Sequence, residues 1–244
     1  MMPIAMIAGV LLYKFVYILG FLTPYLIAVM LFITYCNISV KEIRLSKLHS
    51  YLLLIQLLCS VLVYLILEPF NAIVAQGLMI CILAPAATSA PVITGMLGGN
   101  VESLTTYSLL SNFAVAVISP FFFSFLGETG SMPFLQSLWL ISQKILLLLF
   151  LPFVFAIIIH KYLPRVHNEI KKSQSISFYL WSVALVIITG KTVKFIMDQE
   201  NPDYTVELTI VLGAFVVCVS QFLIGRRLGR HYGDTIAGGQ GLGQ

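Results

Sequence analysis

Charged residues are scarce in this sequence. Asp, Glu, Lys and Arg together make up only 10% of its 244 residues, whereas soluble proteins carry about 25%. Hydrophobic residues make up 59% of the chain, and the mean hydropathy is +0.98. No stretch is long and polar enough to form a separate soluble domain. The composition therefore indicates an integral membrane protein that lies almost entirely in or beside the bilayer.

The sequence also lacks the residue clusters of metal sites, disulfide frameworks and hydrolases. Its four cysteines lie in apolar runs without metal-ligand spacing, which favours buried thiols. They are Cys36, Cys59, Cys81 and Cys218. No His and no acidic pair lies at membrane depth, where an intramembrane hydrolase would need them, and Glu102 stands alone near the mouth of one apolar run. No nucleotide motif occurs. We therefore expect that the protein is not an enzyme and does not bind nucleic acid.

The stretch Leu83–Asn100 interrupts the apolar part of the chain. It reads LAPAATSAPVITGMLGGN and lies between two long apolar runs. Pro85 and Pro91 each remove a backbone donor and clash with the preceding turn, so a spanning helix should break here. We predict two helical pieces within Ala72–Leu97, with irregular backbone in Pro85–Pro91.

A break of this kind has two interpretations. Lipid cannot satisfy the freed amides and carbonyls, so a broken helix must be buried in protein or line a polar cavity. Broken helices near the midplane of the bilayer are the usual binding device of secondary transporters. A proline kink that neighbouring helices repair is the alternative.

Apolar runs predict eight crossings and the start of a ninth. The predicted spans are Ile4–Phe21, Tyr25–Val40, Tyr51–Leu67, the broken Ala72–Leu97, Val101–Leu126, Leu138–Leu163, Ile176–Phe195, Thr205–Gly225 and a segment from Tyr232. Ten of the fourteen basic residues lie around the loops that follow spans two, six and eight. Because basic loops stay in the cytoplasm, we expect a multi-pass protein of the cell inner (plasma) membrane with a cytoplasmic N-terminus.

The last ten residues, TIAGGQGLGQ, are rich in glycine and should make a poor helix. We expect them to form an unwound, polar half-crossing that contains Gln240 and Gln244. A membrane protein that stops in the middle of a span would expose unpaired backbone to lipid. The chain is therefore expected to be truncated at its C-terminus.

Val101–Leu126 carries a stripe of polar side chains along one helical face. The stripe consists of Thr105, Ser108, Ser111 and Asn112. Such a face must point at protein or water. The predicted span Tyr51–Leu67 holds Gln56, and a lone Gln inside a span joins helices more often than it binds a ligand.

The order of these elements resembles the bile acid:sodium symporter family. The family reads close to C-P-G-G-T-A-S-N where this chain has APAATSAP at positions 84–91, and both continue with a Gly-Asn pair, here Gly99-Asn100. Ser119-Pro120 and Leu151-Pro152 also match, and His160-Lys161 follows as in the family. The resemblance implies an all-α, ten-span fold of two inverted repeats, with broken helices four and nine that cross at the centre. About eight and a half spans are present here.

By this resemblance the whole chain, 1–244, is one transmembrane transporter domain. The first repeat covers spans one to five, about 1–126, and a partial second repeat covers spans six to nine, about 134–244. The resemblance also implies alternating access, in which a panel of spans one, two, six and seven rocks against a core that holds spans four, five and nine.

The implied function is secondary active transport of a small organic anion, such as a bile acid or another carboxylate or sulfonate, coupled to sodium. The partners would be the anion, the sodium ion and the lipid bilayer, with no cofactor beyond the ion. Candidate substrate-binding residues are Pro85, Thr88, Ser89, Pro91, Thr94 and Asn112. Candidate sodium ligands are Gln56, Thr88, Ser89, Thr105, Ser108, Gln240 and Gln244.

Two departures from the family pattern keep an alternative open. The family's first sodium site uses a Ser-Asn pair, which falls here at Ala90 and Pro91 and so lacks both side-chain oxygens. A proton-coupled or ion-independent transporter of the same fold is therefore the second hypothesis, ahead of a membrane-embedded sensor or enzyme. We expect Thr88 and Ser108 to matter more for transport than Gln56.

Overall fold

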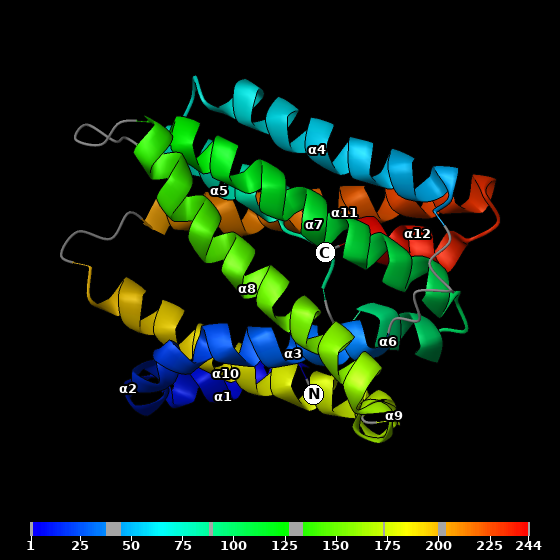
Figure 1. The fold of residues 1–244 in the computed structure, drawn as a ribbon. Helices are drawn as coiled ribbons and strands as arrows, with labels where there is room; N and C mark the ends of the chain where they lie inside the picture. The colour runs from blue at the N-terminus through cyan, green and yellow to red at the C-terminus, as the bar shows by residue number, and fades with distance from the viewer. Residues whose placement is uncertain are drawn as a thin grey trace. The chain divides into compact units, whose positions relative to one another are not determined.

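The computed structural model describes residues 2–37, 45–87, 90–126, 134–172, 174–199 and 204–243. Every regular element in these residues is a helix. In chain order they are α1 (Met2–Leu11), α2 (Tyr13–Val16), the 3-10 helix η1 (Tyr17–Leu22), α3 (Thr23–Asn37), α4 (Lys47–Leu67), α5 (Ala72–Leu83), α6 (Ala90–Met96), α7 (Val101–Leu126), α8 (Phe134–Tyr162), α9 (Pro164–Lys172), α10 (Gln174–Met197), α11 (Tyr204–His231) and α12 (Thr235–Leu242) (Figure 1).

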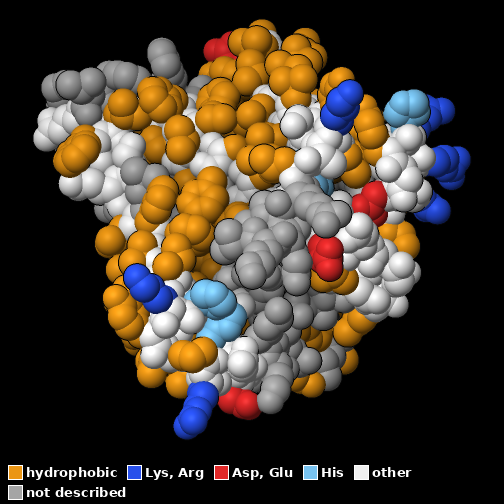
Figure 2. Space-filling view, turned by 45° about the vertical axis from the view of Figure 1, so that its right-hand side comes forward, with side chains coloured by type: hydrophobic (Ala, Val, Ile, Leu, Met, Phe, Trp, Pro, Cys, Tyr) orange, Lys and Arg blue, Asp and Glu red, His pale blue; other side chains and the backbone are white. Residues whose placement is uncertain are grey.

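Five helical stretches in the described residues are long and apolar enough to cross a membrane. They are Tyr13–Cys36, Lys47–Leu67, Val101–Ser124, Ile176–Met197 and Tyr204–His231. Hydrophobic side chains cover much of the face drawn in Figure 2, and charged side chains are few among them. Large apolar side chains that face outward suit contact with lipid. The chain is thus an all-helical, multi-pass membrane protein, as its composition predicts.

The chain divides into two compact units. Unit 1 comprises Met1–Asn37 and Leu148–Pro202, and unit 2 comprises Ile38–Leu147 and Asp203–Gln244. In unit 1, α10 packs against α1, α2, η1 and α3. In unit 2, α4 and α11 both pack against α5, and α12 packs against α11, α7, α6 and α4. Each unit therefore joins segments that are far apart in the sequence.

The joint between the first two predicted spans lies elsewhere than we predicted. Thr23-Pro24, which marks the joint between the predicted spans Ile4–Phe21 and Tyr25–Val40, forms the first turn of α3, and the chain is helical without a loop from Tyr13 to Asn37. Proline is tolerated at the start of a helix, where its missing N–H would be unpaired in any case. The change of direction falls instead at Leu12 and in η1.

The predicted break between two helical pieces is confirmed. The helix α5 ends at Leu83 and α6 begins at Ala90, with non-helical backbone at Ala84–Ala87. Pro85 lies in the irregular backbone, and Pro91 is the second residue of α6. A helix accepts proline in its first turn, so α6 can begin there, but proline disfavours a continuous helix that runs through it from α5.

The glycine-rich end of the chain is helical, which corrects the expected unwound segment. The helix α12 covers Thr235–Leu242, and Asp234 caps it by accepting a hydrogen bond from the backbone N–H of Ala237 at 3.4 Å. A Cβ added to Gly238 would collide with the backbone of Gly225 and Gly229 in α11. Tertiary packing therefore overrides the poor helix propensity of glycine, because only glycine lets the two backbones approach so closely.

Candidate functional site

The end of α5 at the helix break is closed by a side chain from another helix. Pro85 has no N–H to offer the carbonyls of the last turn of α5. The Gln56 side chain of α4 takes over this role, because its Nε2 donates to the carbonyl of Ala84 at 2.7 Å and to that of Leu83 at 3.3 Å. Gln56 itself is fully buried. The break is thus stabilised by an amide that is held in place within unit 2.

The oxygen of the same Gln56 amide is engaged by α7. The Tyr107 hydroxyl donates to Gln56 Oε1 at 2.9 Å, and the Ser111 hydroxyl donates to it at 3.1 Å. An amide side chain offers two donor and two acceptor positions. All four are occupied here, so Gln56 joins α4, α5 and α7 and has no lone pair left for an ion. This geometry matches the helix-joining role better than the sodium-ligand role.

The polar stripe of α7 faces protein, as we predicted. Ser108, Ser111 and Asn112 are almost fully buried, and Thr105 is half-buried. The Ser108 hydroxyl points at the carbonyl of Ala86 across a long 3.5 Å contact. The Thr105 hydroxyl donates to the carbonyl of Val101 in its own helix at 2.7 Å. Both hydroxyls act as donors here, so their oxygen lone pairs stay available to a cation.

Four buried polar atoms of unit 2 have no hydrogen-bond partner among the described residues. They are Thr94 Oγ1, Asn112 Nδ2, Ser124 Oγ and Gln221 Nε2. Buried polar groups are nearly always paired, so each orphan requires an explanation such as a ligand or water. Two of the four, Asn112 Nδ2 and Gln221 Nε2, are amide donors, which would suit a ligand rich in acceptors.

The helix α12 packs against the region that contains the helix break and the polar stripe of α7. The backbone of Gly241 faces the Tyr107 ring so closely that a Cβ there would lie 3.0 Å from two ring carbons. Ala86, Ala90, Leu104 and Tyr107 form one buried cluster with residues of α4 and α12. The break, the polar stripe and α12 therefore meet in one place. Gln240, a candidate ligand, is half-buried on α12.

Five further candidate residues remain to be placed. Thr88, Ser89 and Gln244 lie outside the described residues. Pro85 and Pro91 lie at the break and in the first turn of α6, and they shape the backbone there. The sequence reading missed Tyr107, whose hydroxyl is central to the Gln56 network. The available signal was its spacing, since Tyr107 lies four residues before Ser111 and so shares its face of α7.

A polar cavity of about 360 Å³ lies in unit 2 where α4 begins and the turns before α7 and α12 meet. His49, which is 2% exposed, lines it. The Nδ1 of His49 accepts from the backbone N–H of Ser46 at 3.3 Å, so Nε2 carries the proton and donates to the Ser103 hydroxyl at 3.0 Å. The sequence placed His49 in a loop, whereas the structure uses it to fasten α4 to α7.

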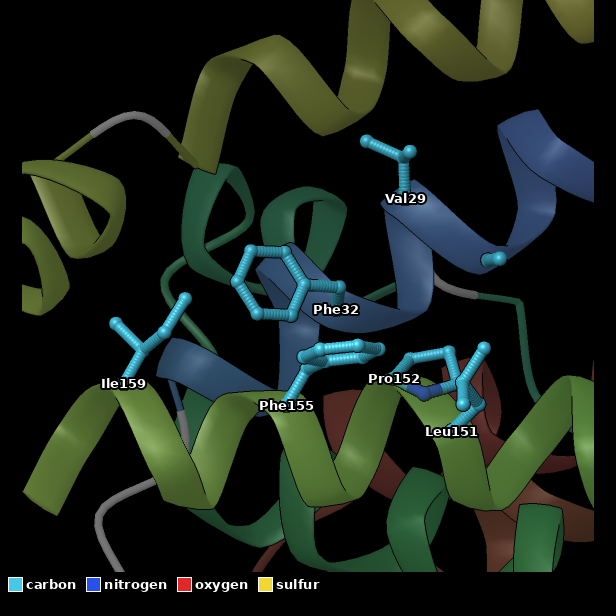
Figure 3. A pocket seen from close by; sticks show the side chains of 7 residues that line it. Val29, Phe32, Leu151, Pro152, Phe155 and Ile159 are labelled. Carbon is cyan, nitrogen blue, oxygen red and sulfur yellow. The ribbon is translucent and has the colours of Figure 1, made fainter.

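Unit 1 contains a cavity of a different kind. It has a volume of about 260 Å³ and lies between α3 and α8. Its lining is entirely apolar: Ala28, Val29, Phe32, Leu151, Pro152, Phe155 and Ile159. Figure 3 shows the rings of Phe32 and Phe155 side by side in this cavity. A cavity without any polar group offers nothing to hold a charged substrate. The candidate site is therefore the region of unit 2 where the helix break meets the polar stripe of α7.

Two comparisons with known proteins bear on this site. A family model described as the SBF-like CPA transporter family matches residues 19–239, which is most of the chain. No match was found among curated proteins.

Proposed function

This chain belongs to the bile acid:sodium symporter (SBF) family, and we propose that it is a secondary active transporter of a small organic anion driven by a sodium gradient. The family consists of transporters and not enzymes, which confirms both the resemblance and the expectation that the chain is no enzyme. The observation that carries the proposal is the helix break, whose freed carbonyls lie beside the buried polar stripe of α7.

The orphan donors support an anionic substrate. Asn112 Nδ2 and Gln221 Nε2 are buried amide nitrogens without an acceptor among the described residues. Leaving a buried donor unpaired costs about 1–3 kcal/mol. A carboxylate or sulfonate supplies acceptor oxygens and would recover this free energy on binding. Pro85, Pro91 and Thr94, with Thr88 and Ser89 from the sequence, complete the proposed substrate region.

Hydroxyl oxygens support a coupling cation. Sodium is a hard ion that prefers oxygen ligands, and the Thr105 and Ser108 hydroxyls keep lone pairs for it. Thr88, Ser89 and the amides of Gln240 and Gln244 remain proposed ligands on the basis of the sequence. Gln56 is the weakest member of the set, because its oxygen already accepts two hydrogen bonds.

A second candidate is a proton-coupled or ion-independent transporter of the same anions. The saturated Gln56 amide favours it, since Nε2 gives the carbonyls at the break the positive charge density that a cation would otherwise supply. Ala90 and Pro91, which replace the family's Ser-Asn pair, favour it as well.

Alternating access is the proposed mechanism, and the two compact units support it. Rocking needs bodies that move as wholes, and each unit has its own internal packing. Unit 1 contains the segments predicted as spans one, two and seven and the later part of span six. Unit 2 contains the helix break and α12.

We further propose an inner-membrane location with a cytoplasmic N-terminus, on the basis of the basic loops. Cysteine labelling of intact cells tests this orientation. Lys171→Cys should be inaccessible to an impermeant reagent from outside, whereas Asp203→Cys in an acidic loop should react. The reverse pattern would invert the topology.

Uptake by the purified full chain in proteoliposomes tests the function. The probes are radiolabelled carboxylates and sulfonates, including taurocholate, under an inward gradient of sodium, of potassium or of protons. Sodium-driven uptake is the expected result. Uptake that does not depend on sodium, and that is either driven by a proton gradient or independent of every ion gradient, would establish the second candidate. Absence of gradient-dependent or facilitated uptake for every anion would overturn both.

A further inference from the structure

The short helix α9 separates apolar and basic residues onto opposite faces. With 3.6 residues per turn, Val166 and Ile170 fall on one side, together with Leu163 just before the helix. The basic residues fall on the other side: Arg165, Lys171 and Lys172. The adjoining helices α8 and α10 are mostly apolar and do not separate polar from apolar residues in this way, so α9 is a different kind of helix. Its pattern is that of a helix lying in a membrane–water interface.

The sequence around Pro164 explains why the chain turns here. Proline cannot donate to the preceding turn and disfavours helix in the residue before it. Thus α8 ends at Tyr162, Leu163 alone forms the joint, and Pro164 opens α9. The His160 and His167 rings contact edge to face, with centroids 4.5 Å apart, and connect the end of α8 to α9. The direction of α9 relative to α8 is therefore fixed within unit 1.

Packing within the protein leaves apolar side chains of this corner exposed. The helix α9 contacts α3, and Ile170 is half-buried. Leu163 and Val166 nevertheless remain about half exposed, at 51% and 45%, and Tyr162 is 69% exposed. These side chains lie at the end of a membrane-spanning helix, where aromatic and aliphatic groups insert at the level of the lipid headgroups.

The charges at this corner are mostly positive. Lys161, Arg165, Lys171 and Lys172 carry four positive charges within twelve residues, against one negative charge on Glu169. Lys161 Nζ lies 5.5 Å from the centre of the Tyr162 ring, so one ammonium group is held beside an exposed aromatic. Basic side chains beside a membrane surface attract anionic lipids, and each Lys or Arg contributes about fivefold in affinity.

We propose that α9 is an interfacial anchor that inserts Leu163 and Val166 among the acyl chains and binds anionic lipid headgroups through its basic face. The lipid contact goes beyond the proposed function, because it would exist for a transporter of any substrate.

Quenching of tryptophan fluorescence by brominated lipids tests the proposal on the full chain in vesicles. Trp139 and Trp181 are first replaced by Phe, and a single tryptophan is then introduced by Val166→Trp. The matched control is Asn168→Trp, two residues away on the polar face. Lipids brominated in the upper acyl chain should quench the Val166→Trp variant roughly twofold or more above the control, because the apolar face lies about 5–10 Å into the boundary.

The lipid headgroup gives the second arm of the test. Brominated phosphatidylglycerol should quench the Val166→Trp variant more than brominated phosphatidylcholine at the same fraction. Replacing Arg165, Lys171 and Lys172 by Gln should abolish this difference but leave the contrast with Asn168→Trp. Equal quenching of the Val166→Trp and Asn168→Trp variants would overturn the proposal. Equal quenching of the Val166→Trp variant by the two lipids, with the three basic residues intact, would overturn it as well. None of these readouts depends on uptake, so they separate it from the proposed function.

Discussion

The two segments that looked breakable in the sequence, α5–α6 and α12, have opposite structures. Both are rich in residues that disfavour helix. The first is broken after Leu83 and its free carbonyls are capped by Gln56. The second is a regular helix that packs on α11 through Gly238. Proline removes a hydrogen-bond donor that no packing can restore, whereas glycine only lowers a propensity that packing can outweigh.

On the basis of this difference we propose different roles for the two segments. The break of α5–α6 leaves backbone carbonyls and the Thr94 hydroxyl, which we propose as ligand contacts. The helix α12 satisfies its own backbone and contributes a smooth glycine surface that closes over Tyr107. We therefore expect substitutions of the α12 glycines to act through packing, and substitutions at the break to act through polar contacts.

The largest effect is expected for Gln56→Leu. The change leaves the carbonyls of Leu83 and Ala84 and the hydroxyls of Tyr107 and Ser111 without their partner. Because each of these four buried groups costs about 1–3 kcal/mol when unpaired, a loss of about 4 kcal/mol or more in unfolding free energy is expected. Thermal unfolding in detergent measures it, with the exposed Gln143→Leu as control. A change below that of the control would mean that the Gln56 cap does not hold the break.

A somewhat smaller loss is expected for Gly238→Ala, which probes the other segment. The added methyl would collide with the backbone of Gly225 and Gly229, and overpacking typically costs about 1–3 kcal/mol. Helix propensity alone would instead favour Ala by about 1 kcal/mol. The sign of the change in unfolding free energy therefore decides between the two effects. Gln240→Ala in the same helix adds no bulk and is the control.

These two cases also show how far the sequence could predict the structure. The break and the buried stripe of α7 followed from local chemistry, since proline and the spacing of Ser108, Ser111 and Asn112 act within one segment. The start of α3 at Thr23-Pro24 is also local, since proline is accepted in a first helical turn. The helical α12 did not follow, because it depends on close packing against α11. The spacing of Tyr107 places it on the face of Ser111, but its hydrogen-bond partner Gln56 lies 51 positions away and could not be predicted.

For transport we expect Thr88→Val and Ser108→Ala to weaken apparent affinity about tenfold each. A hydrogen bond to a charged ligand contributes about 1.5–3 kcal/mol, and 1.4 kcal/mol corresponds to a factor of ten. Ser108 faces Ala86 at the break, and Thr88 follows from the sequence. Concentration dependence of uptake measures both effects, and unfolding should stay unchanged. Normal affinity in both variants would move the site away from the break.

The smallest effect is expected for Tyr107→Phe. It removes one hydroxyl from the Gln56 network but keeps the ring that packs under Gly241. One neutral hydrogen bond contributes about 0.5–1.5 kcal/mol, so the unfolding free energy should fall by about 1 kcal/mol. Tyr179→Phe, at an exposed position of α10, is the control for thermal unfolding. Equal behaviour of the two variants would remove Tyr107 from the network.

Substituted-cysteine accessibility tests most directly whether the break, and not α12, lines the substrate path. The four native cysteines are replaced by Ala, and either Ala87→Cys at the break or Leu242→Cys in α12 is introduced into the full chain. Ala87 is half-buried in the irregular backbone, and Leu242 is fully buried. A water-soluble thiol reagent should label the Ala87→Cys variant in proteoliposomes and not the Leu242→Cys variant, and a transported anion should slow the labelling. Labelling of Leu242→Cys alone, or labelling of Ala87→Cys that no transported anion affects, would contradict the account.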